Sequence, residues 1–82
     1  MYCTAACPFC QAAERLLAEK GATIEKVRVD LEPARRIEMT QKSGGRRTVP
    51  QIWIGARHVG GCDELHDLEG SGELDQLLAK AT

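Results

Sequence analysis

Cys7 and Cys10 are the residues best suited to chemistry, and they flank Pro8 and Phe9 in the sequence CPFC. A run with helical periodicity begins at Pro8, a residue that fits the first helical position, and predicts a helix over 8–20 with Cys7 at its N-cap. There the Cys7 sulfur faces backbone N–H groups that lack partners within the helix, and these donors favour the thiolate that attacks disulfides. Cys10 lies one turn later and can reach the same sulfur, which makes it the natural resolving thiol.

A structural zinc site is the main alternative use of this pair. Such a site needs four ligands, which usually include a second close pair of cysteines or histidines. The remaining candidates are Cys3, Cys62, His58 and His66, and none of them forms a second C-x-x-C. A pair of buried, unreactive cysteines is the plain structural alternative. The spacing therefore favours a redox pair, and we expect no metal.

Size and composition exclude several classes of protein. The 82 residues predict a single domain, 1–82, with a modest core. A net charge of −1 gives no drive toward nucleic acid or membranes, and three aromatic residues are too few for a stacking platform. No apolar run reaches the ~20 residues that span a bilayer, and we see no signal peptide. We expect a cytoplasmic monomer with no nucleic-acid or membrane partner. In that compartment a catalytic or metal role of the four cysteines is more typical than structural disulfides.

The elements that must position the two thiols follow the order β-α-β-α-β-β-α. In the second helix we expect Ala34 and Ile37 to face the core, and we expect Ser71 to cap the last helix. A strand–helix–strand unit implies parallel strands, and the later hairpin is antiparallel, so we predict a mixed four-stranded sheet flanked by helices. The predicted elements are strands at 1–4, 24–31, 50–54 and 57–59, helices at 8–20 and 33–43, and two helical pieces after Gly61.

Two further segments, TVPQI and GGCDE, have possible binding roles. A cis Val49–Pro50 bond would turn the backbone of Val49 outward, where it could pair with an extended peptide as a strand does. A plain strand-initiating proline is the alternative, because only ~5% of X–Pro bonds are cis. The glycines of GGCDE allow close backbone approach, and the amides near Cys62 and Asp63 could bind a carboxylate. A turn followed by a capping aspartate explains the second segment equally well.

The CPFC, TVP and GGCD segments occur in the order and at the spacing of the glutaredoxins, and the chain resembles that family over nearly its whole length. The segment 36–65 resembles the bacterial dithiol glutaredoxins in particular. The resemblance implies an α/β thioredoxin fold and glutathione as cosubstrate. It also implies a glutathione-dependent thiol–disulfide oxidoreductase, whose partners are disulfide-bonded and glutathionylated proteins.

The resemblance also implies residue roles, with Cys7 as nucleophile and Cys10 as resolving thiol. Val49 matches the residue whose backbone pairs with the cysteine of glutathione, next to a cis-proline at Pro50. Cys62 and Asp63 match the positions that hold the γ-glutamyl end, and Arg36 matches the residue that binds the glycine carboxylate. The implied glutathione-binding set is Cys7, Phe9, Arg36, Thr48, Val49, Pro50, Cys62 and Asp63.

Several positions depart from the family pattern. Thr4 replaces the usual lysine, so Arg36, helped by Arg47, must carry more of the glycine carboxylate. Phe9 replaces the usual tyrosine and offers no phenol for a hydrogen bond. Cys3 stands where threonine is common, and we expect an ordinary buried strand residue, with a redox or metal role as the less favoured alternative. The resemblance gives the two histidines no role.

Two other functions fit parts of the pattern. Some glutaredoxins carry a [2Fe–2S] cluster between two protomers, bound by the first active cysteine and glutathione, but a proline after that cysteine is unfavourable for it. A thioredoxin-like donor reduced by a flavoenzyme would share the C-x-x-C pair. Arg36 together with TVP and GGCD favours glutathione instead.

Overall fold

The computed structural model describes residues 1–81, and its strands form two hydrogen-bonded pairs. The strands are β1 (Tyr2–Cys3), β2 (Val27–Arg28), β3 (Ile52–Ile54) and β4 (Arg57–Gly60). β1 and β2 are parallel, β3 and β4 are antiparallel, and an antiparallel bridge between Tyr2 and Gln51 joins the two pairs. The mixed four-stranded arrangement is therefore confirmed. The predicted strand 24–31 is wrong in length, because only Val27–Arg28 pair as a strand. Two backbone bonds extend the contact, from Val27 N to Met1 O (2.9 Å) and from Val29 N to Cys3 O (3.0 Å).

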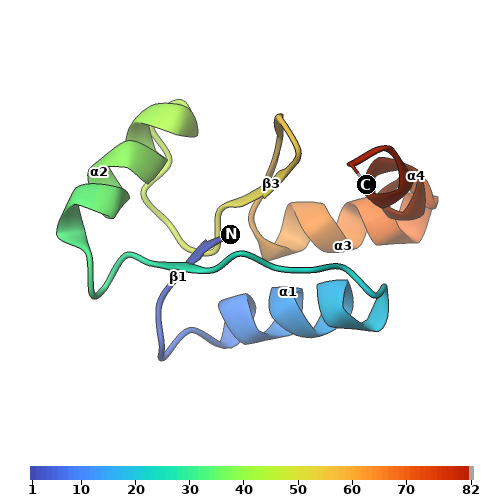
Figure 1. The fold of residues 1–82 in the computed structure, drawn as a ribbon, viewed down its shortest axis with the longest axis horizontal. Helices are drawn as coiled ribbons and strands as arrows, with labels where there is room; N and C mark the ends of the chain where they lie inside the picture. Colours follow the sequence, from blue (N-terminus) through green and yellow to red (C-terminus); the bar gives the residue numbers. More distant parts are fainter. Residues whose placement is uncertain (82) are drawn as a thin grey trace.

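The helices are α1 (Pro8–Glu19), α2 (Pro33–Lys42), α3 (Cys62–Ser71) and α4 (Glu73–Ala81). Figure 1 shows α1 and α2 on opposite sides of the strands, with α3 and α4 following each other near one end of the molecule. The predicted start of α1 and its N-cap are confirmed. Ser71 is the last residue of α3 rather than the residue just before α4, and its hydroxyl accepts a hydrogen bond from Glu73 N (3.4 Å).

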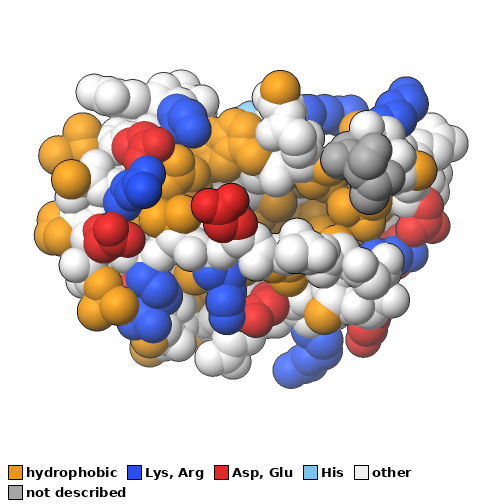
Figure 2. All heavy atoms as spheres, viewed as in Figure 1, with side chains coloured by type: hydrophobic (Ala, Val, Ile, Leu, Met, Phe, Trp, Pro, Cys, Tyr) orange, Lys and Arg blue, Asp and Glu red, His pale blue; other side chains and the backbone are white. Residues whose placement is uncertain are grey.

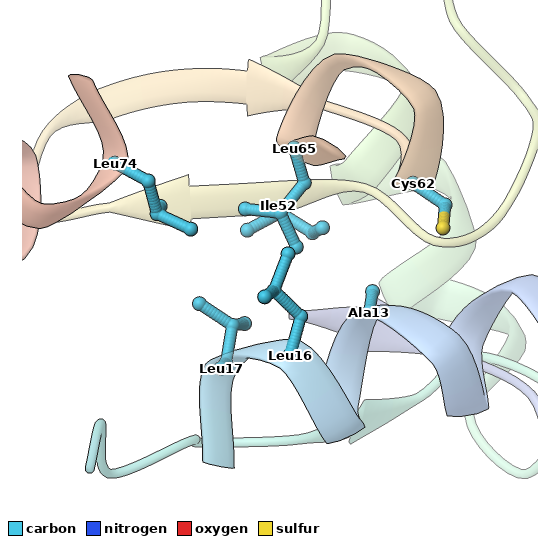
Figure 3. Packing of buried hydrophobic residues seen from close by; sticks show 7 residues of the cluster. All are labelled: Ala13, Leu16, Leu17, Ile52, Cys62, Leu65 and Leu74. Atoms are coloured by element: carbon cyan, nitrogen blue, oxygen red, sulfur yellow. The ribbon is translucent and has the colours of Figure 1, made fainter. Parts of the chain in front are cut away.

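One core cluster lies between α1, α3, α4 and β3. Figure 3 shows Ile52 of β3 at its centre, with Leu16 of α1 and Leu65 of α3 directed toward it. Ala13, Leu17, Leu74 and Cys62 complete the buried set. This cluster packs α1 against α3. The helix that begins after Cys7 and the helix that begins at Cys62 therefore share one apolar contact surface.

A second cluster lies on the α2 side of the strands and corrects the predicted phase of that helix. Met39 of α2 is fully buried against Tyr2 and Val29, whereas Ile37 is 62% exposed and Ala34 is also exposed. Positions two residues apart in a helix differ by about 200°, so burying Met39 turns Ile37 to solvent. The prediction that Ala34 and Ile37 face inward is wrong.

A groove of about 1010 Å³ separates α2 from α4, and the space-filling view shows apolar side chains within it (Figure 2). Its apolar lining includes Tyr2, Ile52, Trp53 and Leu78, and its lining includes none of the four cysteines. Among the described residues, no helix is both long and apolar enough to cross a bilayer.

Candidate active site

Cys7 caps α1 with its sulfur. The backbone N–H of Cys10 donates to Cys7 Sγ at 3.2 Å, and the Cys7 thiol donates to the carbonyl oxygen of Val49 at 3.7 Å. An amide donor and the positive end of the helix dipole both favour negative charge on this sulfur. Cys7 is 8% exposed, so the sulfur lies in a covered position between α1 and the loop around Val49.

Cys10 lies one turn inside α1 and is 3% exposed. Burial, together with the hydrogen bond to the Cys7 side chain, raises the pKa of the Cys10 thiol to about 12. Cys10 is therefore a protonated thiol at neutral pH, while the helix amide acts on Cys7. The environments of the two cysteines therefore differ: the Cys7 sulfur faces an amide donor, whereas the Cys10 thiol is buried one turn inside the helix.

The Val49–Pro50 peptide bond is cis, as the family resemblance implies. The fully buried Gln51 holds this loop, because its side-chain amide donates to Thr48 O (3.0 Å) and Thr48 Oγ1 (3.3 Å). Its Oε1 lies 2.8 Å from His58 Nε2. Since the Gln51 NH₂ group is used by Thr48, Oε1 must accept, and His58 carries a hydrogen on Nε2.

Sequence reasoning missed the roles of Gln51 and His58. A glutamine directly after TVP, within an apolar strand, was the available signal for Gln51. His58 had no local signal, because its contacts come from tertiary structure: it stacks on Trp53 at a ring-centroid distance of 4.4 Å. Burial lowers the pKa of His58, and the charge of Arg46 lowers it further, so the ring is neutral at neutral pH.

The GGCD segment opens α3 beside the cis-proline loop. A Cβ on Gly61 would lie 3.4 Å from Pro50 O, which places the two segments in direct contact. Gly60 has φ +112°, and a Cβ there would lie 2.8 Å from Arg46 Nη1, which is paired with Glu64 (2.7 Å). Only glycine fits this position without displacing the ion pair.

Cys62 is the first residue of α3 and is buried, and Asp63 beside it is exposed. Burial raises the pKa of the Cys62 thiol, with the charges of Asp63 and Cys7 adding to the effect. The N-cap residue of α3, Gly61, offers no side-chain cap. The Glu64 carboxylate already interacts with the backbone amides of Gly61 and Glu64, which leaves the amides of Cys62 and Asp63 as a suitable place for a carboxylate.

Arg36 of α2 contacts the segment that leads into the cis-proline loop. Its Nη1 donates to Arg47 O at 3.1 Å, and the two arginines line a hollow of about 500 Å³ together with Thr40. Within residues 1–81 neither guanidinium forms an ion pair. Two guanidinium groups without an ion-pair partner in this part of the chain thus lie at one hollow, while Phe9 on the first turn of α1 is exposed.

The structure also places Cys3 next to the predicted site. Cys3, Cys7 and Cys10 form one buried cluster, with Val49 and Met1 packed against it. Among the described residues no group of three or more His, Cys, Asp or Glu side chains is arranged to hold a metal ion. The four cysteines are free thiols.

A thiol pair at the start of the helix after β1, opposite a cis-proline loop in a mixed α/β sheet, defines a dithiol protein of the thioredoxin-like fold. Comparison with known proteins narrows the class. The sequence model of the glutaredoxin family matches residues 1–59. The chain therefore belongs to the glutaredoxin family and is an oxidoreductase of that family.

Individual relatives agree with this assignment. A glutaredoxin of Pseudomonas aeruginosa is 51% identical over 79 residues, covering 96% of this chain and 93% of its own. Glutaredoxin 3 of Escherichia coli K12 is 46% identical, covering 95% and 93%. The solution structure of a Brucella melitensis glutaredoxin superposes with a TM-score of 0.85 at 47% identity, covering 99% and 87%. A crystal structure of a buckwheat glutaredoxin–glutathione complex gives a TM-score of 0.90 at 29% identity, covering 98% and 74%.

Proposed function

We propose that the chain reduces protein disulfides and protein–glutathione mixed disulfides with glutathione as cosubstrate. The observation that carries the proposal is the position of Cys7 Sγ, between the Cys10 amide and the Val49 carbonyl. A sulfur held there is favoured as a thiolate and adjoins the backbone of the cis-proline loop. The buckwheat relative, whose structure contains glutathione, supports the choice of cosubstrate.

Glutathione would lie across three parts of the site. Its cysteine would pair with the Val49 backbone, whose carbonyl the Cys7 thiol holds in the free protein. Its γ-glutamyl carboxylate would bind the uncapped amides at Cys62 and Asp63. Its glycine carboxylate would meet Arg36, with Arg47 beside it. Phe9, Thr48 and Pro50 would line the remaining contact surface.

The proposed reaction on a glutathionylated protein has two exchange steps. The Cys7 thiolate attacks the glutathione sulfur, so the bond to the target protein breaks and the target leaves as a thiolate. A second glutathione thiolate attacks the same sulfur, which releases oxidised glutathione and restores Cys7. With a protein disulfide, Cys7 attacks first and Cys10 then attacks Cys7 Sγ, which leaves a Cys7–Cys10 disulfide for two glutathione molecules to reduce.

Turnover of a glutathionylated peptide tests the proposal. With glutathione and glutathione reductase as the electron supply, wild type should turn over, Cys7→Ser should fall to the uncatalysed rate, and Cys10→Ser should keep much of the activity. Cys10→Ser is the matched control, because it removes one thiol from the same turn of α1. Full activity in Cys7→Ser, or reduction by a thioredoxin-type flavoenzyme but not by glutathione, would contradict the proposal.

The cellular setting is part of the same proposal. A cytoplasmic location would keep four free thiols reduced, and each step needs only one copy of the chain, so we propose a monomer. A [2Fe–2S] carrier would instead require two copies. Anaerobic reconstitution with iron and sulfide, followed by a visible spectrum and a mass measurement, separates these functions: a coloured dimer would favour the carrier.

A further inference from the structure

Cys3 is a thiol that the proposed mechanism does not use, although it adjoins the two that it does. The β1 strand alternates its side chains between the faces of the sheet, so Tyr2 packs against Met39 of α2 while Cys3 turns to the α1 side. On that side its buried neighbours are Cys7 and Cys10. Three of the four thiols of the chain therefore share one small cluster.

Burial does not set Cys3 apart from the resolving thiol. Cys3 is 4% exposed and Cys10 is 3% exposed, so any argument that burial makes Cys3 inert applies equally to Cys10. Burial raises the pKa of the Cys3 thiol, but the positive charges of Lys26, the N-terminal amine and Arg28 oppose that shift. The net effect is a raised pKa, as for Cys10, because Lys26 and Arg28 are themselves paired with Glu14 and Asp30.

The contacts within the cluster indicate which cysteine is the partner of Cys3. The Cys7 sulfur is turned to the Cys10 amide and the Val49 carbonyl. Cys3 lies close enough to Cys10 for its charge to raise the pKa of Cys10. The cysteines of the cluster are free thiols, so thiol–disulfide exchange between them is available to the cluster. Cys10 is the thiol through which Cys3 would enter it.

We propose that Cys3 is a third redox-active thiol, which accepts the disulfide of the active pair by forming a Cys3–Cys10 bond. Cys3, as a thiolate, attacks Cys10 Sγ of the Cys7–Cys10 disulfide. The S–S bond to Cys7 breaks, a Cys3–Cys10 bond forms, Cys7 leaves as a thiolate, and the proton lost by Cys3 passes to solvent. No electrons are gained or lost, so the step needs no further oxidant. The oxidised chain then holds its disulfide between its two least exposed cysteines and has a free thiol at Cys7.

This inference rests on the proposed function only in assuming that Cys7 and Cys10 can form a disulfide, and it can fail separately. Trypsin cleavage after Arg15, Arg57 and Lys80 places Cys3, Cys7 and Cys10 on peptide 1–15 and Cys62 on peptide 58–80. Native wild-type protein is oxidised with diamide, denatured, alkylated, digested without reductant and sequenced by fragmentation. Peptide 1–15 with alkylated Cys7 reports the Cys3–Cys10 disulfide, and the same peptide with alkylated Cys3 reports Cys7–Cys10.

We expect both forms of peptide 1–15 in oxidised wild type. In Cys7→Ser we expect the same peptide to carry an internal disulfide and no alkyl group, while Cys62 is fully alkylated. The control Cys3→Ser/Cys7→Ser should lose the internal disulfide and leave Cys10 to react alone. Alkylation confined to Cys3 in oxidised wild type, or alkylation of both Cys3 and Cys10 in oxidised Cys7→Ser, would overturn the proposal. Turnover of the glutathionylated peptide by wild type, measured on the same preparation, shows separately whether the proposed function holds.

Discussion

Helices α1 and α3 both begin beside a buried cysteine, but they use it differently. Cys7 stands at the N-cap of α1 and its sulfur accepts an amide hydrogen. Cys62 stands one position later relative to its helix, after the N-cap Gly61, and its sulfur lies 3.4 Å from His66 Nδ1 instead of on an amide. A shift of one residue relative to the cap thus decides whether a helix amide donates to the cysteine sulfur, as in α1, or not, as in α3.

The largest expected effect separates the two cysteines by activity. Cys7→Ser should abolish turnover of a glutathionylated peptide, whereas Cys62→Ser should keep kcat within about threefold, because the site at α3 uses backbone amides. Steady-state kinetics of both variants provide the measurement. A loss in Cys62→Ser as large as that in Cys7→Ser would show that the second thiol is chemically required.

The reactivity of the two thiols toward iodoacetamide should also differ. Burial raises the pKa of Cys62, so its thiolate fraction at neutral pH is below that of a free cysteine, and each unit of pKa changes that fraction about tenfold. We expect Cys7 to be alkylated faster than Cys62, since the Cys7 sulfur accepts the Cys10 amide hydrogen at the start of α1 and Cys62 has no such donor. Time-resolved alkylation followed by mapping of peptides 1–15 and 58–80 measures both rates together. Equal alkylation rates for Cys7 and Cys62 would show that the start of α1 does not activate its cysteine more than the start of α3 does.

Gly60 tests the geometry at the start of α3. Gly60→Ala should destabilise the protein by about 1–3 kcal/mol, because the position has φ +112° and the added Cβ would meet the Arg46–Glu64 pair. Gly70→Ala is the matched control. Gly70 lies in α3 with open space around it, so the variant should be more stable than wild type by about 0.5–1 kcal/mol. Urea unfolding of both variants gives the comparison. A Gly60→Ala protein as stable as wild type would show that this turn is not constrained.

Much of this arrangement could be predicted from the sequence where local rules decide it. Pro8 and the spacing of apolar residues were enough to start α1 at the correct residue and to put Cys7 at its cap. The phase of α2 could not be predicted, because packing of Met39 on Tyr2 and Val29 sets it and no local pattern favours Met39 over Ile37.

The same limit applies to the site. The contacts between Gln51 and His58, and the grouping of Cys3 with the active pair, join residues whose proximity arises only when β1, the cis-proline loop and β4 meet. The cis bond itself was implied by the family resemblance, since base rates alone favour trans.

The smallest expected effect concerns the loop that leads into α1. Asp30 accepts hydrogen bonds from Arg28 and from Ala5 N, and the Arg28 guanidinium lowers the pKa of Asp30 to about 2. Because the folded-state pKa is lowered, the contribution of Asp30 to stability is present above its unfolded pKa of about 4 and is lost as the pH falls toward 2. Asp30→Asn should therefore have a shallower loss of stability between pH 4 and pH 2, seen in thermal unfolding at a series of pH values. A wild-type slope in Asp30→Asn would exclude this carboxylate.

The most direct test of the central claim is the location of the glutathione adduct. Cys10→Ser, mixed with a glutathionylated peptide in the absence of free glutathione, cannot resolve the intermediate through Cys10. Acid quenching, digestion without reductant and fragmentation then locate the modification. The account predicts glutathione on Cys7 in peptide 1–15. Glutathione on Cys62 in peptide 58–80, or a chain that remains unmodified while the substrate is consumed, would contradict it.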